Sequence, residues 1–166
     1  MEVRSVEAIV RALNEANVQY LIVGGLAVNA HGYERLTVDV DLVIGLQPEN
    51  IIRGLRALAE VDYHASVPVT PEQFADPLLR DEWRREKGMV VLKLWSDSHR
   101  RTPLDVFIYE PFDFRLEYER ASFQAVAGDV RAPVLAYNSL LEMKQGAGRP
   151  KDLLDIAALR KLDPYR

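Results

Sequence analysis

Hydrophobic and polar residues alternate along the chain in periods that predict helices and strands in turn. In residues 3–17 the apolar positions recur every three or four residues, which predicts an amphipathic helix lying on a sheet. Residues 48–60 repeat this spacing after Pro48, a residue that suits the first turn of a helix. Residues 20–23 and 89–95 are short apolar runs, which indicate buried strands.

The second half of the chain adds paired strands. Residues 103–108 predict a strand that follows 89–95 across a hairpin loop at 96–102. Residues 123–126 and 130–134 predict a smaller hairpin that turns at the Gly-Asp pair between them.

The remaining segments are read from their turn residues. Three prolines in residues 61–77 predict a loop or short pieces, and the charged residues 78–86 predict a short exposed helix. Two helices, at about 137–145 and 150–162, are separated by a Gly-Ala-Gly turn. The sequence thus predicts an α/β (α+β) fold in which helices flank a small mixed β-sheet. We expect one domain over 1–166, with a C-terminal two-helix extension at about 137–162.

Composition narrows the functional classes. With 166 residues, 48% of them hydrophobic, the chain is long enough for a sizeable core, and its net charge of −4 does not favour general attraction to nucleic acid. Zero cysteines exclude disulfides and thiolate zinc sites, and the sequence has no run of 18 apolar residues that would span a membrane. The N-terminal helix carries acids, unlike a secretory signal, so we expect a cytoplasmic protein and no membrane partner.

Two aspartates in the second strand of the stretch 20–44 are the first chemical signal. Asp39 and Asp41 are two residues apart, so a strand would place both carboxylates on one face. The alternate positions Val38, Val40, Leu42 and Ile44 would then face the core. Adjacent like charges are unfavourable unless a cation lies between them, and a divalent metal bound by oxygen ligands supplies one. Two solvated acids on an edge strand are the alternative.

A glycine pair precedes these acids. Gly24 and Gly25 follow the strand 20–23 and lead into a helix of about two turns ending near Ala30. Glycine lets a ligand approach the backbone closely, and free N–H groups at a helix start attract phosphate. Asp105 lies in the apolar strand 103–108, where an aspartate needs a partner. It is a candidate third ligand of the same metal, or else a capping or salt-bridged aspartate.

The order Gly24-Gly25, then Asp39-x-Asp41, resembles the signature of the DNA polymerase β nucleotidyltransferase superfamily. Within it, the run GGLAVNAHGYERLTVDVDL resembles the small AbiEii/AbiGii-type nucleotidyltransferases, many of them toxins of toxin–antitoxin systems. The resemblance implies a polymerase β-like fold with Mg²⁺ or Mn²⁺ held by Asp39, Asp41 and Asp105, and it makes Asp105 the candidate base. It departs at Gly25, where many members have serine. Backbone N–H groups would then hold the phosphates, and Gly25→Ser would be tolerated.

The resemblance extends to basic residues. Arg35 and Thr37 match an R-x-T-x-D-x-D pattern, and Lys144 and Lys151 match a K-x4-R-x-K-D-x2-D helix junction. We expect Gly24, Gly25, Arg35, Thr37, Lys144 and Lys151 to bind nucleotide. For Arg35 a surface position is the alternative, and for the lysines it is simple complementation of helix ends. His31 and the Trp83-Arg84-Arg85 run fit a structural role or a ligand contact.

The implied activity is transfer of NMP from an NTP to an acceptor hydroxyl, with release of pyrophosphate. The acceptor would be a tRNA or other RNA 3′ end, or a protein, and a cognate antitoxin is a possible partner. Two other functions are consistent with the same residues: a non-catalytic nucleotide- or partner-binding module, and a phosphate hydrolase using the same metal.

Overall fold

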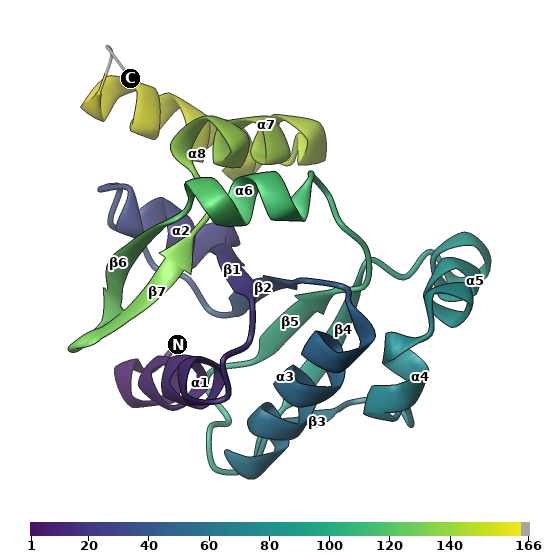
Figure 1. The fold of residues 1–166 in the computed structure, drawn as a ribbon. Helices are drawn as coiled ribbons and strands as arrows, with labels where there is room; N and C mark the ends of the chain where they lie inside the picture. Colours follow the sequence, from purple (N-terminus) through teal and green to yellow (C-terminus); the bar gives the residue numbers. More distant parts are fainter. Residues whose placement is uncertain (164–166) are drawn as a thin grey trace.

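The chain folds around a mixed sheet of seven strands in the order β3-β4-β5-β2-β1-β7-β6 (Figure 1). The computed structural model describes residues 1–163, and its mixed α/β architecture confirms the predicted fold class. The strands are β1 (Tyr20–Val23), β2 (Val40–Ile44), β3 (His64–Ala65), β4 (Val91–Trp95), β5 (Leu104–Phe107), β6 (Ser122–Ala127) and β7 (Val130–Val134).

Strand pairing places the two halves of the chain side by side in the centre of the sheet. β2 pairs antiparallel with β1 and parallel with β5, and β1 pairs parallel with β7. The predicted hairpins are confirmed, because β4 pairs antiparallel with β5 and β6 with β7. The central position of β2 and β5 decides where the acidic residues of these two strands meet.

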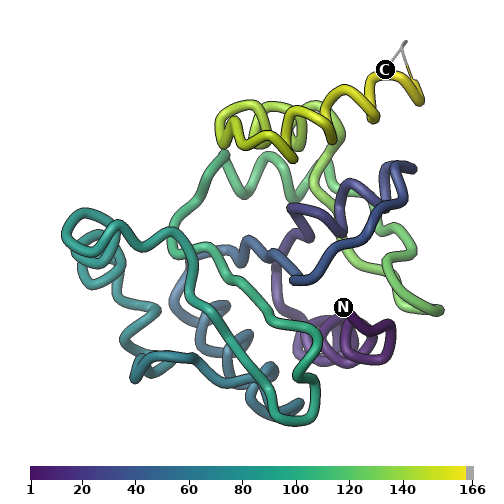
Figure 2. Tube along the Cα trace, turned by 180° about the vertical axis from the view of Figure 1, so that it is seen from behind, coloured from purple at the N-terminus to yellow at the C-terminus, as the bar shows by residue number. Residues whose placement is uncertain are grey.

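Helices pack around the sheet. In Figure 1, α1 and α3 lie below the strands β1 and β2, and α6, α7 and α8 lie above them. Figure 2 shows the same separation from behind, with the N-terminal helix and the C-terminal helix at opposite sides of the sheet. The helices are α1 (Val3–Glu15), α2 (Gly24–Ala30), α3 (Pro48–Glu60), α4 (Pro71–Ala75), α5 (Pro77–Lys87), α6 (Phe114–Arg120), α7 (Tyr137–Ala147) and α8 (Pro150–Leu162).

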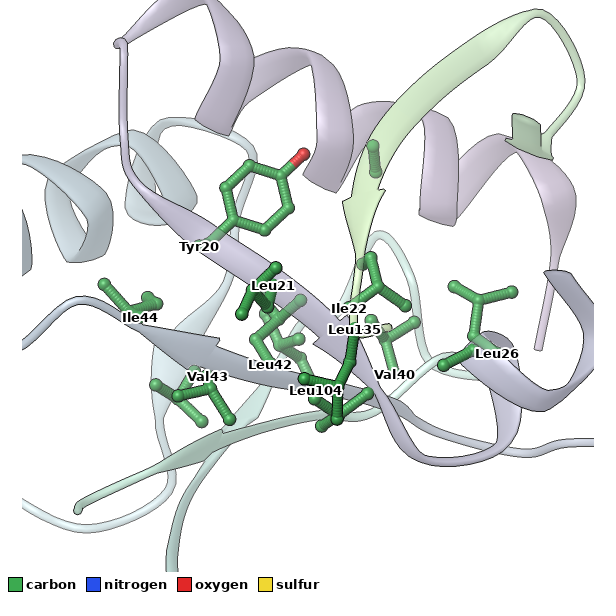
Figure 3. Close-up of a cluster of buried hydrophobic side chains, with 14 of the residues drawn as sticks. Tyr20, Leu21, Ile22, Leu26, Val40, Leu42, Val43, Ile44, Leu104 and Leu135 are labelled. Atoms are coloured by element: carbon green, nitrogen blue, oxygen red, sulfur yellow. The ribbon is translucent and has the colours of Figure 1, made fainter. Parts of the chain in front are cut away.

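The core forms where the central strands meet these helices. β1 and four of the five β2 residues are buried on both faces, which is why they are apolar runs rather than alternating patterns. Figure 3 shows this cluster, in which Leu21, Leu42 and Leu104 come from three neighbouring strands. The predicted apolar face of α1 is confirmed, since Val6, Ile9, Val10 and Leu13 are fully buried.

Three local predictions were wrong or incomplete. β2 begins at Val40, so Asp39 lies just before the strand and Val38 is 67% exposed instead of facing the core. The aromatic segment after β5 contains α6, which the sequence did not predict. Asp113 caps α6 by accepting a hydrogen bond from the Leu116 backbone N–H.

No helix within residues 1–163 has both the length and the apolar character to cross a membrane.

Candidate functional site

Three aspartates meet at one end of the two central strands. Asp41 of β2 lies opposite Asp105 of β5 in the parallel register, so both side chains leave the same face of the sheet. Asp39 joins them from the residue before β2. One carboxylate oxygen from each residue lies within 4.8 Å of the others. The structure therefore brings together the three acids that the sequence singled out.

The crowding changes the acid strength of the central member. Burial and, after it, the negative charges of Asp39 and Asp105 raise the pKa of Asp41 to about 6, against the opposing effect of Lys151 and Lys144. The contributions of Asp39 and Asp105 to this shift show that negative charge is concentrated around Asp41. A bound cation would offset that charge.

The three acids fit a hard divalent cation. Their donor atoms are all carboxylate oxygens, which Mg²⁺ and Mn²⁺ prefer, and their separation lets one ion contact all three. Asp39, Asp41 and Asp105 are the residues that would hold it.

Neighbouring side chains leave no room for a Cβ at either glycine of the turn after β1. Gly24 has φ +63°, a left-handed conformation that favours glycine, and a Cβ there would collide with the Asp41 carboxylate. A Cβ on Gly25 would lie 2.9 Å from the Thr37 Cβ, closer than real contacts allow. The expectation that Gly25→Ser is tolerated is therefore wrong. Phosphate binding by the backbone of this turn stays a prediction.

The segment that leads to the acids is held at Arg35 by hydrogen bonds to α2 and to α8. Asn29 of α2 donates to the Arg35 carbonyl and accepts from the Arg35 N–H. The Arg35 guanidinium donates from Nε to Asp155 Oδ1 at 2.6 Å and from Nη2 to Asp155 Oδ2 at 2.7 Å. Arg35 is thus neither a solvated surface residue nor free for phosphate, and its predicted nucleotide contact requires exchange of partners.

The C-terminal helix junction contains a buried ionic network. The Lys144 ammonium, on a residue only 5% exposed, lies 3.1 Å from Asp152 Oδ1 and 2.7 Å from Asp155 Oδ2. Arg149 donates from Nε to Asp152 Oδ2 at 2.7 Å. Burial raises the pKa of both aspartates, but hydrogen bonds from Arg149 or Arg35 and from Lys144 outweigh it and hold both below their usual range. This network joins α7 and α8 to the segment before β2.

Lys151 stands apart from that network. It is exposed and carries a positive charge that lowers the pKa of Asp41. The acids, the glycine turn, Arg35, Thr37, Lys144 and Lys151 all line one cleft of about 1320 Å³. The far wall of this cleft comes from the 109–113 loop, α6 and α7.

Sequence reasoning missed Lys93, which contacts the site directly. It lies opposite Asp105 in the β4–β5 register, and its Nζ donates to Asp105 Oδ2 at 3.0 Å and to Oδ1 at 3.2 Å. The Lys93 side chain is 67% exposed, so it can move away from Asp105 without disturbing the core. Alternation along 89–95 places Lys93 between apolar neighbours, and this was the only available signal.

Other candidates have structural partners. His31 Nε2 shares a hydrogen bond of 2.8 Å with the Leu135 carbonyl. The Arg84 guanidinium lies 3.7 Å from the centre of the Tyr109 ring, and Arg85 pairs with Asp81.

The first prediction concerns acid crowding. A pKa raised to about 6 means that Asp41 does not destabilise the fold below about pH 4 and does so increasingly as pH rises through about 6. Asn at position 41 cannot titrate. Without divalent ions, the unfolding free energy of Asp41→Asn should therefore rise by about 3 kcal/mol relative to that of wild type between pH 4 and pH 7. Urea unfolding from pH 4 to 7 with chelator measures this difference. A difference that does not change with pH contradicts the crowding.

The second prediction concerns the glycine turn. Gly25→Ser should cost about 1–3 kcal/mol of unfolding free energy, because the new Cβ forces Thr37 to move. Gly146→Ser is the matched control, since nothing lies within 4 Å of a Cβ there. Equal melting temperatures of the two variants would show that the turn has room.

The third prediction concerns the buried network. Lys144→Met should lose about 3–5 kcal/mol of unfolding free energy, because two buried aspartates lose their shared cation. Lys151→Met, at an exposed position, should stay within about 0.5 kcal/mol of wild type. If denaturant unfolding gives similar values for both variants, the network does not support the fold.

Comparison with known proteins finds likeness in fold but not in sequence. No protein-family model and no curated protein matches the sequence. Among solved structures, the fold is similar to the antibiotic-resistance factor ANT(2'')-Ia, with TM-score 0.63, 13% identity, and coverage of 96% of this chain and 82% of that one. It is also similar to the lincosamide antibiotic adenylyltransferase LnuA bound to lincomycin, with TM-score 0.58, 15% identity, and 95% of each chain covered.

A third similar structure is an antigenic nucleotidyltransferase-like protein from Paracoccidioides brasiliensis, with TM-score 0.56 and 21% identity. It covers 97% of this chain and 76% of that one. At these identities the likeness concerns the fold: the chain has the fold of nucleotidyltransferases.

Proposed function

We propose that this protein is a metal-dependent nucleotidyltransferase that moves NMP from an NTP to an acceptor hydroxyl. The observation that carries the proposal is the meeting of Asp39, Asp41 and Asp105 within 4.8 Å of one another, in a cleft that also holds a glycine turn and cationic side chains. Carboxylates for a divalent ion, backbone for phosphate and cations for a polyphosphate are the parts that phosphoryl-type transfer needs.

Each group has a place in the proposed reaction. The acceptor oxygen attacks the α-phosphorus, the bond from that phosphorus to the bridging oxygen breaks, and pyrophosphate leaves. Asp105 takes the proton of the acceptor hydroxyl, which requires Lys93 to move away from its carboxylate. Divalent ions held by the three aspartates would supply charge stabilisation to the phosphates.

The triphosphate belongs at the C-terminal junction. Lys151 is exposed and lines the cleft, whereas Lys144 is buried between two aspartates. We therefore assign the direct phosphate contact to Lys151 and give Lys144 the task of holding the junction. Gly24, Gly25 and Thr37 lie on the acid side of the same space, and Arg35 joins them when it exchanges Asp155 for phosphate.

The acceptor defines the biological role. The AbiEii-type resemblance of residues 20–44 suggests a cytoplasmic toxin that modifies a tRNA or RNA 3′ end, or a protein, and is restrained by an antitoxin. The LnuA structure, an adenylyltransferase bound to lincomycin, suggests a small-molecule hydroxyl as a third class. All three share the same transfer chemistry.

The fourth prediction tests that chemistry. With an α-labelled NTP and Mg²⁺ or Mn²⁺, wild type should release pyrophosphate and label an acceptor, and chelator should abolish both. Asp41→Asn and Asp105→Asn should fall to background while keeping the fold. Asp129→Asn, on the exposed turn of the β6–β7 hairpin, is the control and should retain turnover.

The products separate the alternatives. Free labelled NMP without a labelled acceptor would indicate a hydrolase. Binding of NTP with no product in the presence of total tRNA, protein extract and small amino alcohols would indicate a non-catalytic module. Wild-type turnover by Asp41→Asn would remove the acids from the active site.

A further inference from the structure

A buried glutamate on the far wall of the cleft has one carboxylate oxygen without a hydrogen-bond partner. Glu117 of α6 is 6% exposed and lines the cleft, and its Oε2 atom has no hydrogen-bond partner. Its other oxygen, Oε1, lies 3.7 Å from Arg120 Nη1, beyond hydrogen-bond distance. Burying a carboxylate costs free energy unless donors satisfy it, so this site calls for a donor from outside the chain.

The surroundings of Glu117 define what kind of molecule would bring that donor. Phe107, Tyr109, Phe112 and Leu116 line the same cleft, and the Tyr109 ring also stacks against Arg84. Leu116 is 41% exposed, which indicates apolar surface open to a ligand in the cleft. A flat apolar body suits this wall, and a charged N–H donor suits the carboxylate.

The cleft is also divided by charge. At its C-terminal end Lys151 is exposed, while Lys144 and Arg149 are paired with Asp152; the α6 wall carries Glu117 and the exposed Asp113. A polyphosphate is attracted to the first end and repelled by the second. An RNA acceptor would have to lay its own phosphates against the acidic wall.

We propose that the α6 wall is the acceptor subsite and that it takes a small hydroxylated amine with an apolar body, whose cationic group binds Glu117. This rests on the proposed function for the identity of the acceptor, and binding at the subsite stands by itself. The acceptor hydroxyl would then face Asp105, which lines the same cleft.

The test uses two small probes that differ in one group. Phenylethanolamine carries a ring, a hydroxyl and an ammonium, and 1-phenyl-1,2-ethanediol replaces the ammonium by a hydroxyl. Wild type with Mg²⁺ and a non-hydrolysable NTP should bind the amine at least about tenfold more tightly in NMR titration, since a charge-assisted hydrogen bond is lost with the diol. Equal affinities for the two probes would overturn the proposal.

Variants assign the preference to one residue. Glu117→Gln should remove the tenfold preference and leave NTP affinity unchanged, while Glu119→Gln, exposed on the same helix, should keep the preference. Thermal melting checks that both variants fold. A preference that survives in folded Glu117→Gln would overturn the assignment, and the wild-type comparison decides the proposal should that variant not fold.

Turnover provides an independent arm. Labelled-NTP assays should transfer NMP to the amine in preference to a short RNA with a free 3′ hydroxyl. Transfer to the RNA alone would overturn the subsite and leave the nucleotidyltransferase intact. Amine binding that depends on Glu117 without any pyrophosphate release would support the subsite and overturn the nucleotidyltransferase.

Discussion

Mutual repulsion among three carboxylates is the constraint on which the rest of the site depends. Asp41 and Asp105 are held in register by strand pairing and cannot move apart without breaking the central sheet. The chain offsets part of this charge with Lys93 on one side and Lys151 on the other. A divalent ion fits the remaining excess of negative charge.

The same crowding explains why the turn after β1 contains two glycines. The Asp41 side chain occupies the space that a Cβ on Gly24 would need, and Thr37 occupies that of Gly25. The close approach of the 35–37 segment therefore leaves no room for a side chain at position 25.

The buried ionic network lies apart from the three acids and fixes the position of the cleft wall that α7 and α8 form. Arg35, Lys144 and Arg149 share two aspartates of α8, so α7 and α8 are joined to the segment before β2. Buried ion pairs contribute little net stability, but their geometry is specific. Here the ion pairs keep Lys151 and the α7 wall at fixed places relative to the three aspartates.

Sequence periodicity was enough for the central elements and not for their long-range partners. The i, i+2 spacing of Asp39 and Asp41, and an aspartate inside an apolar strand at Asp105, indicated a shared site because strands constrain side-chain direction. Nothing local links Arg35 to Asp155, which is 120 positions away. Helix α6 has only seven residues, too few for a periodic signal, and Asp113 as an N-cap was its only marker.

That unpredicted helix changes how the whole cleft is understood. Without α6, the sequence shows acids and cations and suggests only where a triphosphate lies. With it, the cleft gains apolar lining residues and a buried carboxylate with one unsatisfied oxygen. In the proposed reaction, two substrates of opposite charge would enter one space at different places, because each is repelled from the place of the other. Their reacting atoms would meet at the three aspartates.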